Sequence, residues 1–118
     1  MAVNEALVAV NKTLLLVGSA IRGVERTLNN NPPPDRELDL TQLRSDLETV
    51  KDQFEARRTA LENGGQTIPP PDPALIAQIQ PLIAQVEAAR NAGAAASATI
   101  AVAGQALTLA TNVLSQLG

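Results

Sequence analysis

The sequence predicts an all-α fold: an up-down-up three-helix antiparallel bundle with heptad packing and a longer C-terminal helix kinked near Pro81. Apolar residues recur at alternating spacings of four and three along each long segment, which is typical of a helical seam. The tetrapeptide PPPD occurs twice, each time before a new segment. The apolar share of 45% is almost entirely aliphatic, with Phe54 as the one aromatic residue. The length of 118 residues suits one domain, so residues 1–118 are treated as a single helical domain.

The first predicted helix covers about residues 3–29. Its seam consists of Val3, Leu7, Val10, Leu14, Val17, Ile21, Val24 and Leu28. We expect it to end at NNNPPPD, because the residue before a proline is disfavoured in the helical conformation. Val8 and Leu15 lie on another side of this helix, and Leu16 points in a third direction. A three-helix domain alone would leave these three side chains in water.

The second predicted helix covers about residues 36–63. Its seam consists of Leu40, Leu43, Leu47, Val50, Phe54, Arg57 and Leu61. Asp39 with Gln42 resembles a capping box, and Asn63-Gly64-Gly65 is a typical C-terminal stop. From Asp35 to Glu62 the chain carries eight of its twelve acidic and five of its nine basic residues, so this helix should face solvent. Pairs of opposite charge one turn apart are Arg44 with Glu48, Lys51 with Glu55, and Arg58 with Glu62.

The third predicted helix covers about residues 73–117. Each PPPD should form a stiff reversal whose aspartate, Asp35 or Asp72, caps the next helix, and Pro73 suits a first helical position. The seam then consists of Leu75, Ile79, Leu82, Val86, Ala89, Gly93, Ala96, Ile100, Ala103, Leu107, Ala110, Leu114 and Leu117. Because this rhythm continues through Gly93, we expect no break there. Pro81 should bend the helix near Ala77 or separate residues 73–80 as a short turn. At about 1.5 Å per residue, such a helix would extend well beyond its two partners.

The end of the chain, from Asn91 to Gly118, contains no charged residue. On a helical wheel of about 100° per residue its larger apolar side chains gather on one half, and its Ser, Thr, Asn and Gln residues, with the exception of Thr99, lie on the other. An apolar arc of about 180° suits contact with two neighbouring helices. Together with the extra apolar stripe of the first helix, it predicts a homo-oligomer. The predicted interface consists of Val8, Leu15, Ile100, Val102, Leu107, Leu109, Val113 and Leu114.

These features favour a structural or assembly protein, a self-associating subunit of a ring, fibre, phage or secretion component. The alternative is a membrane-active protein, pore-forming or lipid-associating, that releases its uncharged C-terminal helix into lipid. Gln105 and Asn112, near the centre of that segment, are costly in a bilayer. The chain also lacks Trp and Tyr, and no basic residue follows the segment to fix its orientation. The membrane alternative is therefore the weaker one.

The chain offers little material for catalysis, and we expect no catalytic, metal or cofactor site and no small-molecule substrate. It has neither His nor Cys, which removes the usual general base and the usual strong nucleophile. Asp35, Glu37 and Asp39 have the alternate spacing of calcium ligands, but acidic residues also favour a helix start. Arg57 beside Arg58 would suit a small helical enzyme acting on carboxylates, although an Arg57 that extends to solvent is the simpler interpretation.

The overall charge argues against nucleic acid as a partner. Twelve acidic and nine basic residues give a net charge of −3, without the basic stripe that phosphate binding needs. The N-terminus has no basic region and carries Glu5 before its apolar run, unlike a secretory signal. We therefore expect a cytoplasmic location by default, with export by a specialised route as the alternative.

Overall fold

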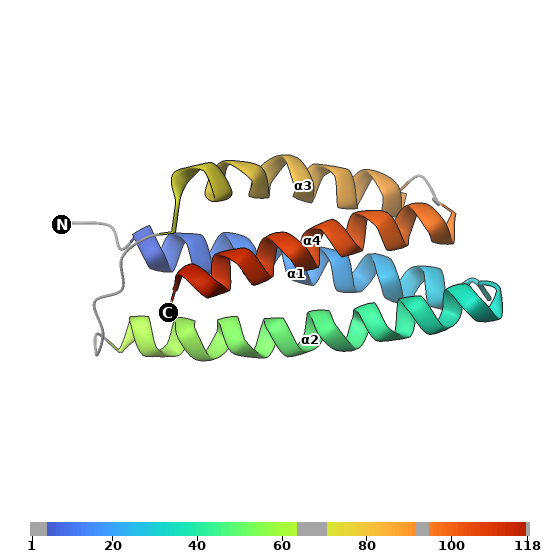
Figure 1. Ribbon diagram of the computed structural model, residues 1–118, viewed down its shortest axis with the longest axis horizontal. Coiled ribbons are helices and arrows are strands. Elements are labelled where there is room, and N and C mark those ends of the chain that lie inside the picture. Colours follow the sequence, from blue (N-terminus) through green and yellow to red (C-terminus); the bar gives the residue numbers. More distant parts are fainter. Residues whose placement is uncertain (1–4, 64–70, 92–94, 118) are drawn as a thin grey trace.

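The computed structural model describes residues 5–63, 71–91 and 95–117, and these residues form an all-helical bundle (Figure 1). Its four helices are α1 (Glu5–Asn29), α2 (Pro34–Glu62), α3 (Pro73–Asn91) and α4 (Ala96–Gln116). Successive helices run in opposite directions, so that α1 and α3 point one way and α2 and α4 the other (Figure 1). The all-α class and the alternating directions of the first three helices agree with the sequence prediction.

The four helices do not contact one another equally. Both α1 and α4 contact all three other helices, whereas the described residues of α2 and α3 make no contact with each other. The pair α1 and α4 therefore forms the centre of the bundle, with α2 on one side and α3 on the other (Figure 1). Burial agrees with this arrangement, because twelve residues of α1 are buried but only five of the longer α2.

The prediction of one long helix over residues 73–117 was wrong. Helix α3 ends at Asn91, and Ala95 has an extended backbone with φ −61° and ψ 156° before α4 begins. Gly93 lies outside the described residues. The physical reason for the reversal is burial: a straight helix would leave the apolar half of residues 96–117 in water, whereas the turn places it against the other three helices. Because the heptad spacing of apolar residues continues from α3 into α4, this spacing alone does not show where one helix ends and the next begins.

The proline inside α3 has less effect than predicted. The helix continues through Pro81 from Pro73 to Asn91, so residues 73–80 do not form a separate turn. The predicted kink near Ala77 is not confirmed. Pro81 still has no N–H, so the carbonyl of Ala77 lacks its usual donor four residues along the helix.

The two PPPD connectors end differently. At the second one, Asp72 caps α3 as predicted: its Oδ1 accepts a hydrogen bond from the Ala74 N–H at 2.9 Å, and Pro73 is the first helical residue. At the first one, α2 begins earlier than predicted, Pro33 is the N-cap, and no side chain caps the helix. Asp39 lies inside α2, so the predicted capping box is absent.

The turn between α1 and α2 uses a rare backbone conformation. Asn31 has a φ of 55°, in the left-handed region that Asn tolerates better than most residues. This residue reverses the chain directly before the three prolines, whose fixed φ angles then start α2.

The seams predicted from spacing form most of the core. The largest fully buried side chains include Phe54, Leu40 and Leu47 from α2. Leu16 of α1 is also fully buried, because the fourth helix covers a direction that a three-helix bundle would have left open. Val8 and Leu15 remain 37% and 64% exposed.

The surface of α2 carries two of the three predicted ion pairs. Lys51 pairs with Glu55 at 3.8 Å and Arg58 with Glu62 at 3.7 Å, while Arg44 and Glu48 are not within ion-pair distance. All four paired side chains are well exposed, so each pair contributes only a few tenths of a kcal/mol, about 0.3–0.5. Helix α2 is held in place by its buried seam.

Loss of the one aromatic side chain should be severe. Phe54 is fully buried in a core of small aliphatic side chains. We expect Phe54→Ala to lower the free energy of unfolding by about 3–5 kcal/mol, because it leaves a cavity that neighbouring helices fill only in part. Urea denaturation followed by circular dichroism measures this change. Leu38→Ala, at a side chain that is 74% exposed, is the control and should change stability by less than about 0.5 kcal/mol.

The two connector aspartates provide a matched pair for testing the cap. Asp72→Ala removes the side-chain bond to the Ala74 N–H and should cost about 1 kcal/mol. Asp35→Ala removes no capping bond and should cost only about 0.3 kcal/mol, through the weaker interaction with the helix dipole. Thermal unfolding of both variants checks the difference. Equal losses would show that Asp72 does not act as a cap.

Candidate functional site

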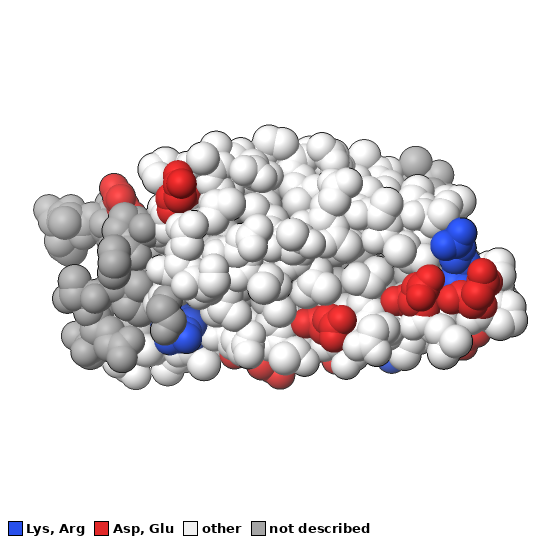
Figure 2. All heavy atoms as spheres, viewed as in Figure 1, with Lys and Arg blue, Asp and Glu red and all other residues white. Residues whose placement is uncertain are grey.

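Charge is distributed very unevenly between the two helical hairpins. Of the twelve acidic and nine basic residues, only Asp72, Glu87 and Arg90 lie beyond residue 63. Figure 2 shows the consequence: the face formed by α3 and α4 is almost free of charged side chains, and those visible lie over α2 and toward the ends of the bundle. This uncharged face is the most unusual surface among the described residues.

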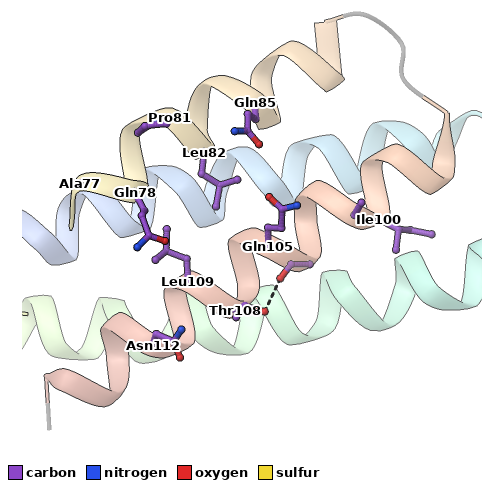
Figure 3. Close-up of a pocket in the computed structure, with 12 residues that line it drawn as sticks. Ala77, Gln78, Pro81, Leu82, Gln85, Ile100, Gln105, Thr108, Leu109 and Asn112 are labelled. Carbon is purple, nitrogen blue, oxygen red and sulfur yellow. Dashed lines mark hydrogen bonds between the residues drawn. The ribbon is translucent and has the colours of Figure 1, made fainter. Parts of the chain in front are cut away.

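An open groove of about 830 Å³ runs along this face between α3 and α4 (Figure 3). We refer to it as the α3–α4 groove. Its lining contains no charged residue. The lining consists of small residues and a proline (Ala77, Pro81, Ala101, Gly104), apolar side chains (Leu82, Ile100, Leu109) and polar uncharged ones (Gln78, Gln85, Gln105, Thr108, Asn112).

The amide side chains of the groove retain unused hydrogen-bonding capacity. Gln85 on α3 and Gln105 on α4 point toward the space between the two helices (Figure 3). Among the described residues, the side chains of Gln85, Gln105 and Asn112 have no hydrogen-bond partner, whereas Gln78 donates to the Ala74 carbonyl at 3.2 Å. Each such amide offers two donors and one acceptor oxygen. Amides that are exposed and unpaired can bind a polar, uncharged group without competing internal bonds.

A glycine occupies the middle of the α4 side of the groove. Glycine in a helix interior is roughly 0.5–1 kcal/mol less favourable than alanine, so its presence calls for a local reason. Apart from its chain neighbours and the backbone of α4 itself, no described atom lies within 4 Å of the position that a Cβ on Gly104 would take. Packing within the chain therefore does not require glycine at this position.

Two polar contacts hold the ends of α4. The hydroxyl oxygens of Thr27 and Thr99 are 3.1 Å apart, which joins the last turn of α1 to the first turn of α4. At the other end, the Asp72 N–H donates to Gln116 Oε1 at 2.6 Å, which joins the start of α3 to the end of α4. The second contact therefore connects the two walls of the α3–α4 groove at one end.

The predicted interface residues do not form one surface. Leu109 and Val113 are buried in the core, and Ile100, Val102, Leu107 and Leu114 are partly buried against it. Val8 and Leu15 lie on the exposed side of α1, and because α1 and α4 pack against each other, that side points away from the exposed side of α4. Of the eight residues, Ile100 and Leu109 line the α3–α4 groove. The prediction of an oligomer interface at these residues stays a prediction.

The glutamine and asparagine residues of the groove were not predicted as site residues from the sequence, although their spacing gave an indication. Gln78 and Gln85 are seven residues apart, and so are Gln105 and Asn112. A heptad interval places each pair on one side of its helix. Sequence reasoning treated Gln105 and Asn112 only as obstacles to a membrane span, because their proximity to α3 depends on the unpredicted reversal.

Other polar groups do not assemble into a site. Neither the α3–α4 groove nor the two other cavities described for the bundle is lined by Arg57 or Arg58, and Arg90 lies beside a gap of only about 10 Å³. Ser19 Oγ and the Nε and Nη2 atoms of Arg26 are buried without a hydrogen-bond partner among the described residues. Ser19 and Arg26 lie two turns apart on α1, about 10 Å along the helix, and line none of the three cavities found among the described residues. They give no indication of chemistry.

In the part of the chain that the structure describes, two helices are long and apolar enough to cross a membrane, by length and composition alone. They are α1 and α4, with 56% and 33% of their most apolar windows buried inside the bundle. Core helices of soluble proteins pass the same test, and the contact between α1 and α4 is consistent with that role. The buried share is lower for α4 because one side of this helix is exposed, in part at the α3–α4 groove.

Comparison with known proteins adds no assignment to this geometry. The sequence matches no protein-family model, and no curated protein and no solved structure shows significant similarity to it.

Proposed function

We propose that this chain is a structural subunit that self-associates, with protein-protein contact rather than catalysis as its role. The observation that carries the proposal is the uncharged face of α3 and α4.

Desolvation is the main physical support. Burying an ionised side chain in an interface costs several kcal/mol unless a partner charge compensates it. The centre of a protein interface is accordingly depleted in charged residues. On the outer side of α4 the exposed residues are alanine, serine, threonine, asparagine and glutamine, which lose little on removal from water when their polar groups find partners.

The surface proposed for self-association differs from the one expected from the sequence. A helix extending beyond its partners was expected to expose its apolar half, but α4 turns back and places Leu109 and Val113 in the core. What remains exposed is the neutral polar side of α4 together with the alanine- and glutamine-rich side of α3. Self-association therefore uses a surface of small and amide side chains.

The mass in solution tests this proposal directly. At micromolar concentration, sedimentation equilibrium should give a mass that is a multiple of the 12.3 kDa chain. Raising the salt concentration should not dissociate the assembly, because no ion pairs hold an uncharged interface. A mass of one chain at all concentrations would contradict the proposal.

A membrane-active protein is the second candidate, and one observation favours it: α4 has the length and apolarity of a span and contains no charged residue. Because α4 occupies the centre of the bundle, entry into lipid requires its separation from α1. The close approach of Thr27 and Thr99 provides a means to prevent that separation.

A reversible lock would separate the two candidates. The chain has no Cys, so Thr27→Cys with Thr99→Cys introduces one pair at a contact of 3.1 Å between the original side-chain oxygens. If α4 acts in lipid, the oxidised variant should lose flotation with liposomes and the reduced variant should regain it. If the structural proposal holds, neither form floats and both self-associate like the unmodified chain.

A further inference from the structure

We propose that the α3–α4 groove is the contact surface for a second copy of this chain, related by a two-fold axis, with α4 of each copy lying against the groove of the other. This inference rests on the proposed self-association and specifies its surface and symmetry. Three independent observations support it.

The first observation concerns charge. At a two-fold interface a surface meets its own copy, so an ionised side chain near the axis would face a like charge. The groove lining contains no ionised side chain. An amide both donates and accepts hydrogen bonds, so Gln105 of one copy can pair with Gln105 or Asn112 of the other. Gln85, Gln105 and Asn112 are without partners among the described residues, as such pairing requires.

The second observation concerns Gly104. It lies in the groove, and the space where its Cβ would be is empty within the chain. A glycine without an internal packing reason fits a position where another backbone approaches from outside. Ala101, one turn earlier and exposed, adds a second small residue to this part of the groove. Small residues at this spacing allow two helices to approach closely.

The third observation concerns size. With 19 and 21 residues, α3 and α4 are each about 30 Å long, and two adjacent helices are about 20 Å wide. Their joint face therefore measures on the order of 600 Å² per copy as a flat area. Stable protein interfaces bury about 800 Å² of accessible surface per partner, and accessible surface exceeds flat area. The joint face is therefore of the same order of size as the area that a specific dimer buries.

Two substitutions test the surface without damage to the fold. Ala101→Arg places a charge on the exposed side of α4 and should weaken self-association at least roughly tenfold, because two arginines meet across the axis. Ala56→Arg introduces the same charge at an exposed alanine of α2, a helix that does not contact α3, and should leave self-association unchanged. Sedimentation over a range of concentrations measures both dissociation constants.

Gly104→Ala gives a sharper test because it should stabilise the fold but weaken self-association. In the Ala101→Arg background, where the chain is expected to be monomeric, it should raise the melting temperature by about 3 °C through better helix propensity. In the unmodified chain it should weaken self-association roughly tenfold, because the added methyl group separates the two backbones. Gly23→Ala is the control. Its Cβ also meets no atom within 4 Å, but Gly23 is buried inside the bundle, so it should stabilise the fold without changing self-association.

The outcomes separate this inference from the proposed function. The two-fold contact at the groove is supported if Gly104→Ala raises the melting temperature and weakens self-association. Gly23→Ala and Ala56→Arg must at the same time leave self-association unchanged. An oligomer that Ala101→Arg and Gly104→Ala leave intact overturns the inference alone, and loss of that oligomer in Leu15→Arg would assign the contact to α1. A chain that remains monomeric overturns both. Lipid binding that responds to Ala101→Arg, without any change in mass, also overturns the inference.

Discussion

The packing of α1 against α4 is the contact on which the rest of the structure depends. Each of these helices contacts all the others, and α2 and α3 meet only through them. The side chains buried along both helices are mainly Ala, Val and Leu, and the buried polar ones are Thr13, Ser19, Thr27 and Thr99. Small side chains let the two helices lie close together, which compensates for the scarcity of aromatic residues. The position of α2 and α3 follows from this central pair.

How much the sequence could predict depends on the range of the interaction. Helix ends set by local chemistry were largely predictable: NNNPPPD ended α1, and Asp72 with Pro73 started α3. The core positions Val17, Leu47 and Phe54 followed from heptad spacing. The reversal between Asn91 and Ala96 was not predictable in this way, because the seam keeps its rhythm through it. Burial of the apolar half of α4, a long-range effect, outweighs the local preference for a continuous helix.

The candidate site could be predicted from the sequence even less well than the fold, for the same reason. That the last part of the chain is uncharged was evident from the sequence, and it drew attention to α4. Which side of α4 faces the core was not evident, and Leu109 and Val113, two residues of the predicted interface, are buried within the chain. The groove arises only when Gln85 and Gln105 come together across the turn. A surface built from two segments requires knowledge of the fold between them.

The division of the core between two hairpins has a consequence for the folding reaction. Neither α1–α2 nor α3–α4 can bury its apolar residues alone, because α1 needs α4 and α4 needs α1. Helices and local turns form within microseconds, but the stabilising contact joins segments from opposite halves of the chain. Closing that long loop costs conformational entropy before the central contact between α1 and α4 can form. We therefore expect folding of this chain to be cooperative, with the meeting of the first and last helices as its slow step.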